Sequence, residues 1–132
     1  MIALDVDVSR TGPLLAGRGA QVVDEALAYA LTQVGQAASE GVHRVLDERI
    51  QHPTPYYETQ ITTDHPPGQV RVHDRGVAYG PWLEGVSSRN RTTKFPGYHA
   101  FGLTAQSLAG GRAQRIAEDA VARYVAQLGG GL

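Results

Sequence analysis

A helical pattern of unusual length constrains the fold of this chain more than any other feature. From Ala20 to about Ile50, apolar residues recur every three to four positions and form one stripe. A straight helix over this range would extend about 45 Å, at roughly 1.5 Å per residue. We expect a bend or a break near Gly41, because Gly35 and Gly41 weaken the helix. Pro53 and Pro55 end whatever helix remains.

Shorter segments outside this helix alternate with the period of two that is typical of strands. Ile2–Val8 is one such segment, and Tyr56–Thr63 is another that is rich in strand-forming residues. Gln69–His73 follows the turn residues Pro66-Pro67-Gly68, so the pattern predicts a β-hairpin. Val77–Tyr79 is expected as a third short strand after the next turn.

The last third of the chain is helical again. The pattern predicts a helix over Thr104–Leu128, interrupted at Gly110-Gly111 and ended by the glycines from Gly129 onward. We therefore predict an α+β fold in which a small antiparallel sheet, the hairpin plus the N-terminal strand, packs with a long N-terminal and a C-terminal helix. The 132 residues fit one domain, 1–132.

Composition narrows the classes of function that the chain can have. The formal net charge of −1 does not favour general attraction to nucleic acids or membranes. The absence of cysteine excludes disulfides, thiolate catalysis and cysteine-based zinc sites. No apolar stretch reaches the ~20 residues of a membrane helix, and the N-terminus is not typical of a secretory signal. We expect a soluble protein that is made in a cytosol and has no membrane partner.

One segment stands out by its composition. Tyr79–Phe101 holds five of the nine aromatic residues, including the only tryptophan. Between its aromatic ends lies Ser87–Lys94, which is basic and contains no acid. Aromatic and arginine side chains are frequent anchors of protein interfaces. We expect an extended loop at about 85–97 that holds a partner.

Residues that could carry chemistry are sparse. His65, His73 and Asp74 flank the hairpin and, if they meet, could form the metal site of a small metal-dependent hydrolase. Polar residues beside turns more often make local hydrogen bonds, and no metal-binding spacing such as HExxH is present. Ser87 and Ser88 do not lie in a nucleophile elbow. We expect no catalytic residue, no cofactor and no metal.

The basic loop has a second interpretation. Arg89, Arg91 and Lys94 could contact DNA phosphates, and Arg71 and Arg75 would extend the patch if the hairpin lies beside the loop. Because the chain is close to neutral, we expect such contact only as one surface of an assembly.

The segment Tyr79–Phe101 resembles part of a known protein family. The stretches Tyr79-Gly80-Pro81-Trp82-Leu83-Glu84-Gly85, Ser88-Arg89-Asn90 and Lys94–Phe101 look like part of the small neck proteins of long-tailed double-stranded DNA bacteriophages. These are head-to-tail connector or tail-completion proteins, and the likeness is to those of actinobacteriophages. The close match covers about a sixth of the chain. The glycine-rich stretch Leu103–Gly111 departs from the family pattern, which leaves the course of the final helix open.

The resemblance implies a structural virion protein rather than an enzyme. It implies a homo-oligomeric ring of roughly six or twelve copies, at the junction between the DNA-filled head and the tail. The implied partners are the head-closure or adaptor ring and the tail terminator or tail tube proteins, with passing contact to genomic DNA. Assembly would take place in the host cytoplasm. A tail terminator or a minor tail protein is the alternative within the same class.

We assign the interface of this expected ring to the segment Tyr79–Phe101. Pro81–Glu84 is predicted as one helical turn, and the aromatic ends are expected to fasten the loop to its own subunit. The polar middle is expected to reach a neighbour. The predicted interface residues are Trp82, Arg89, Asn90, Arg91, Lys94, Phe95 and Tyr98.

Overall fold

A computed structural model describes residues 1–7, 18–49 and 55–129. The elements in chain order are β1 (Ala3–Asp7), α1 (Arg18–Arg49), α2 (Pro55–Thr59), β2 (Thr62–Asp64), β3 (Gln69–His73), α3 (Gly80–Glu84), α4 (Arg89–Thr93), α5 (Ala100–Ser107), the π-helical turn η2 (Leu108–Arg112) and α6 (Ala113–Gly129). The predicted α+β class is confirmed. None of the helices in the described ranges is long and apolar enough to cross a membrane.

The sheet has three antiparallel strands in the order β1-β3-β2. Leu4 pairs with Val72 and Val6 with Val70, so these side chains share the face that meets the helices. The opposite face is polar, and Arg71 donates to its register partner Asp5 at 2.6 Å there. The hairpin predicted at the proline-containing turn is confirmed, with Gly68 at φ +68° in that turn.

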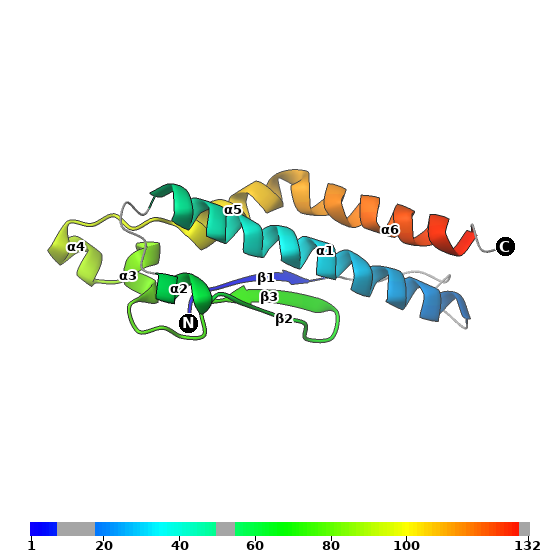
Figure 1. Ribbon diagram of the computed structural model, residues 1–132, viewed down its shortest axis with the longest axis horizontal. Coiled ribbons are helices and arrows are strands. Elements are labelled where there is room, and N and C mark those ends of the chain that lie inside the picture. The colour runs from blue at the N-terminus through cyan, green and yellow to red at the C-terminus, as the bar shows by residue number, and fades with distance from the viewer. Residues whose placement is uncertain (8–17, 50–54, 130–132) are drawn as a thin grey trace.

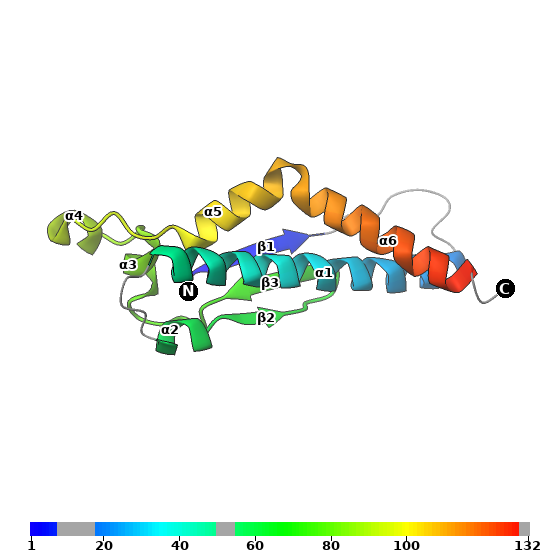
Figure 2. The ribbon, with the colours of Figure 1, turned by 45° about the horizontal axis from the view of Figure 1, so that its top comes forward.

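Helix α1 spans most of the length of the molecule, with the sheet along one side and α5 and α6 along another (Figures 1 and 2). The core forms where these layers meet, and the apolar stripe predicted from periodicity contributes to it. Its buried residues are Leu4, Ala38, Val42, Leu46, Tyr57, Val72, Ala100, Phe101 and Leu108.

Helix α1 continues through Gly41 without the expected break. Its two internal glycines instead allow close packing. A Cβ on Gly35 would lie 2.6 Å from Val70 Cγ2, and a Cβ on Gly41 would lie 2.7 Å from Thr104 Cγ2. The sheet and α5 therefore approach the helix backbone at the two glycines where the sequence predicts a weak point.

The predicted strand over Tyr56–Thr63 is wrong in its first half. Pro55–Thr59 is a short helix, and only Thr62–Asp64 is a strand. Tyr57 is 2% exposed and its hydroxyl donates to Asp74 at 3.0 Å, so a buried tertiary contact overrides the local preference of this segment for a strand. The predicted strand Val77–Tyr79 is also wrong, because these residues form the turn before α3.

The C-terminal helix begins at Ala100, four residues before the predicted start, and is interrupted as predicted. Gly111 has φ +109°, a conformation that favours glycine, and it separates α5 and η2 from α6. Figure 2 shows the resulting kink, after which α6 packs along the first half of α1. Pro53, Val8 and the last three residues lie outside the described ranges.

Candidate interaction site

The aromatic segment Tyr79–Phe101 forms a closed loop at one end of the molecule. Its ends meet at Gly85 and Gly97, which have φ +99° and +89° and approach so closely that a Cβ on either would overlap the other strand of the loop. The Tyr98 N–H donates to the Leu83 carbonyl at 2.6 Å and closes the base. We call residues 86–96 the knob; its helix α4 lies at the far end of the molecule, beyond α3 (Figures 1 and 2). Compact loops with touching ends are often functional.

Asn90 braces the knob from inside. Its Oδ1 accepts from the Ser87 N–H at 2.8 Å, and its Nδ2 donates to the carbonyls of Trp82 and Phe95, both at 2.8 Å. One side chain therefore joins the start, the middle and the end of the loop. We predicted Asn90 as a partner contact, and the structure commits its amide to the loop itself.

Three aromatic rings form the base of the knob. The Trp82 and Phe95 ring centroids are 4.4 Å apart, and those of Phe95 and Tyr98 are 5.0 Å apart in an edge-to-face arrangement. The Trp82 Nε1–H donates to the Thr93 hydroxyl at 3.0 Å. All three rings are half-buried, so they fasten the loop to the subunit as expected and still present an edge or face outside.

The predicted cations lie on the outside of the knob. Arg89, Arg91 and Lys94 are exposed, and their charged groups form no hydrogen bond or ion pair with the described residues. No acidic residue occurs between Gly85 and His99. The knob therefore presents uncompensated positive charge.

The other predicted members of a basic patch lie on or beside the sheet. Arg71 lies on the polar face of the sheet, bound to Asp5, and Arg75 lies exposed in the turn after β3 at φ +61°. Arg71 is therefore already paired with an acid, unlike the knob cations.

A groove runs beside the base of the knob. It has a volume of about 500 Å³, and its lining combines aromatic residues, hydroxyl-bearing residues and one arginine. The lining residues are Ala78, Tyr79, Trp82, Ser87, Ser88, Arg89 and Thr93. Four of them, Trp82, Ser87, Arg89 and Thr93, are also held in place by the bonds that brace the knob.

Glu84 fixes the orientation of the loop relative to the body, and sequence reasoning missed it. The side chain is 8% exposed, and its two oxygens accept from the backbone N–H groups of Phe101 and Gly102 at 2.9 and 2.8 Å. These are the first turn of α5, where free N–H groups need an acceptor. A single acid between Trp82-Leu83 and a glycine gave no periodic signal that pointed to this role.

His65, His73 and Asp74, the residues of the hydrolase alternative, lie in separate surroundings. His73 Nε2 lies 2.6 Å from Asp64 Oδ2, and its Nδ1 accepts from the Arg75 N–H at 3.0 Å, so both ring nitrogens are used. Asp74 is buried and accepts from the Ile2 N–H, the Tyr57 hydroxyl and the Gly76 N–H, at 3.2, 3.0 and 2.9 Å. Within residues 1–7, 18–49 and 55–129, no three His, Asp or Glu side chains are arranged to hold a metal ion.

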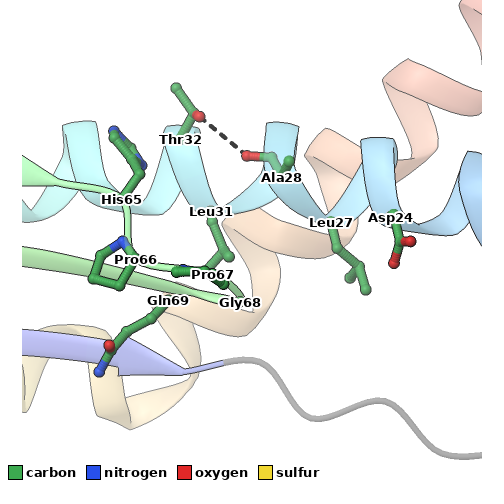
Figure 3. A pocket seen from close by; sticks show the side chains of 10 residues that line it. All are labelled: Asp24, Leu27, Ala28, Leu31, Thr32, His65, Pro66, Pro67, Gly68 and Gln69. Carbon is green, nitrogen blue, oxygen red and sulfur yellow. Dashed lines mark hydrogen bonds between the residues drawn. The ribbon is translucent and has the colours of Figure 1, made fainter.

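His65 lines a second hollow, between α1 and the β2–β3 turn. This pocket of about 450 Å³ has mainly apolar walls, and Figure 3 shows His65 and Asp24 near its opposite ends. The imidazole and the carboxylate are therefore not gathered into one site. The lining residues are Asp24, Leu27, Ala28, Leu31, Thr32, His65, Pro66, Pro67, Gly68 and Gln69.

Burial has a clear electrostatic effect beside Asp74. Desolvation raises the pKa of the Tyr57 phenol well above its ordinary value, and the negative charge and hydrogen bond of Asp74 add to this. A neutral phenol that donates to a buried carboxylate is a structural bond between α2 and the end of β3.

Comparisons of the chain with protein-family models, with curated proteins and with solved structures gave no match.

Proposed function

We propose that the chain is a structural subunit of the neck of a long-tailed bacteriophage, and that the knob is its contact with a neighbouring protein. The sequence resemblance of Tyr79–Phe101 suggests the setting. The observation that carries the proposal is that this same segment is a braced knob at the end of the molecule, with three exposed cations that have no partner in the described residues.

A braced loop suits a docking role for an energetic reason. Ordering a flexible segment on binding costs conformational entropy, which subtracts from the affinity. The bonds of Asn90 and the ring contacts of Phe95 hold the knob in one shape before any partner arrives. Its exposed surface has the arginine and aromatic character that interfaces favour.

The position of the knob fits a ring. A contact made by one end of a subunit meets a different surface on its neighbour, and such head-to-tail contacts close into rings when the rotation between subunits allows it. The proposed neighbours are further copies of the chain, the head-closure or adaptor ring and the tail terminator or tail tube proteins, in the virion neck. A tail terminator or a minor tail protein remains the alternative of the same class.

A shortened subunit tests the proposal. Because Gly85 and Gly97 already touch, Ser87–Lys94 can be replaced by two glycines with little strain on the body. We expect this subunit to keep its helical circular dichroism and a cooperative unfolding transition. We expect phage that carries it to accumulate DNA-filled heads and separate tails, counted by electron microscopy.

A matched control separates the knob from general damage. Replacing the exposed Gln127 and Ala126 of α6 by glycine alters a surface far from the knob and should leave joining intact. Infectious virions in normal number from the shortened subunit would show that the knob does not join heads to tails.

A further inference from the structure

One wall of the groove beside the knob is apolar, and its indole N–H already has a hydrogen-bond partner. The Trp82 indole N–H is already bonded to the Thr93 hydroxyl, which in turn donates to the Arg89 carbonyl at 2.8 Å. The indole therefore offers a ligand only apolar surface. Tyr79, which is 40% exposed, extends this wall.

The other wall supplies donors and positive charge. Arg89 and Ser88 line the groove, and the Arg89 guanidinium and the Ser88 hydroxyl have no partner among the described residues. Arg91 and Lys94 add positive charge on the same knob, and no carboxylate lies between Gly85 and His99 to offset it. Such a wall favours a carboxylate, since a guanidinium–carboxylate bond is both charged and directional.

We propose that this groove binds a short acidic segment of a second protein, with an apolar side chain against Trp82 and a carboxylate on Arg89. The proposal rests on the assembly role of the knob and names the chemistry of its partner. A groove of about 500 Å³ accommodates a few side chains, which favours an extended segment over a folded surface.

Other occupants fit less well. Single-stranded nucleic acid binds where successive bases stack on open ring faces, whereas Trp82 packs against Phe95 and Tyr79 against Tyr57, with centroids 4.4 and 5.8 Å apart. A second copy would have to offer an acid in an extended segment. The acids of the described chain instead lie on helices and strands and in folded turns, as Asp5 does on β1 and Asp119 on α6.

The chain itself provides the probe for a test. Trp82 is the only tryptophan, so its indole N–H gives one resonance in an NMR spectrum and reports on the groove alone. We would titrate the labelled full-length protein with the capped peptide Glu-Leu-Glu-Leu and, separately, with its neutral counterpart Gln-Leu-Gln-Leu. A decanucleotide of thymidine tests the nucleic-acid alternative.

We expect the acidic peptide to shift the Trp82 resonance. The neutral peptide should bind more weakly, by a factor of about ten or more. Arg89→Gln should weaken the acidic peptide by about tenfold to a hundredfold, which is the loss of one charged hydrogen bond. Arg123→Gln removes a cation on α6 and should leave binding unchanged. Binding should weaken as salt is raised, because the attraction is screened.

Several results would overturn the proposal. Equal binding of the two peptides would exclude recognition of a carboxylate, and no shift with either would exclude the groove as a peptide site. A shift with the oligonucleotide alone would assign the groove to nucleic acid. A Trp82 shift that depends on protein concentration alone would assign it to a second copy.

The peptide titration and the assembly test distinguish failure of the groove proposal from failure of the neck proposal. Peptide binding with normal virions from the shortened subunit would contradict the neck proposal and retain the groove. Failure of heads and tails to join, with no peptide binding, would retain the neck proposal and contradict the groove.

Discussion

At the scale of single residues, Asp74 shows how a buried carboxylate organises this fold. It is 0% exposed and receives hydrogen bonds from three separate segments, through the Ile2 N–H, the Tyr57 hydroxyl and the Gly76 N–H. Gly80 packs so closely on its Oδ2 that any side chain there would overlap it. Both carboxylate oxygens are thus hydrogen-bonded where water is excluded.

Removing this carboxylate should be costly. Asp74→Ala leaves three donors without an acceptor, and we expect the free energy of unfolding to fall by about 3 kcal/mol or more. Denaturant unfolding followed by circular dichroism measures this. Asp119→Ala, on the exposed side of α6, is the control and should change stability by less than about 0.5 kcal/mol. A similar small effect at Asp74 would contradict the role described.

Tyr57 adds a prediction at alkaline pH. Burial first, then Asp74, raise its folded pKa above the unfolded value of about 10. The unfolded chain therefore loses this proton first, and stability that is present below pH ~10 should fall as pH rises above it. Tyr57→Phe should make that fall shallower by up to ~1.4 kcal/mol per pH unit. An identical pH slope in the two proteins, measured by urea unfolding, would show that the phenol is not the cause.

Asn90 is the residue on which the shape of the knob depends. Asn90→Ala breaks three hydrogen bonds of the loop, so we expect faster amide hydrogen exchange at Ser87 and a more polar environment in Trp82 fluorescence. The body should stay folded because the knob lies outside the core. Thr92→Ala, an exposed position on the same short helix, is the matched control. Unchanged exchange in Asn90→Ala would show that the ring contacts alone hold the loop.

At the scale of elements, the sequence predicts what depends on long periodic patterns. The stripe of α1 and the interruption at Gly110-Gly111 are both found in the structure. The local rules fail where tertiary contacts decide, as at Tyr57, whose burial against Asp74 turns a predicted strand into α2. The sequence pattern does not predict helix α4, because this helix is five residues long and polar and has no apolar stripe.

The candidate site was predictable in part. The aromatic and basic composition of Tyr79–Phe101 identified the loop, and the prediction that its ends fasten it to the subunit agrees with the ring contacts. The roles of Asn90 and Glu84 were not predictable, because each depends on backbone groups that come together only when the loop closes. The groove likewise depends on Tyr79 and Arg89 meeting in space.

The glycines of α1 give a prediction that reverses the usual rule. Ala is a better helix former than Gly by about 1 kcal/mol, yet Gly35→Ala should lower the free energy of unfolding by about 1–3 kcal/mol. The new methyl would meet Val70, which is fully buried, at 2.6 Å. Gly110→Ala has open space around it and should not destabilise the protein. Thermal unfolding compares the two, and a stabilising Gly35→Ala would contradict the close packing.

At the scale of the whole molecule, the chain consists of an elongated body and the knob at one end of it (Figure 1). The body is α1 with the sheet and with α5 and α6 packed along it, and the knob extends beyond α3 (Figure 1). Glu84, which accepts from the first turn of α5, and the Gly85–Gly97 contact tie the two together.

Site-specific photo-cross-linking in particles of the proposed phage would show whether the knob contacts a neighbouring protein. The chain has no cysteine, so one cysteine at the exposed Thr92 of the knob can carry a benzophenone label, and one at Gln127 of α6 is the matched control. We predict that illumination links the label at Thr92 to a neighbouring polypeptide, identified by mass spectrometry, and that Gln127 gives a weaker product or none. Assembled particles in which Thr92 gives no cross-link while Gln127 does would contradict the claim that the knob is the contact.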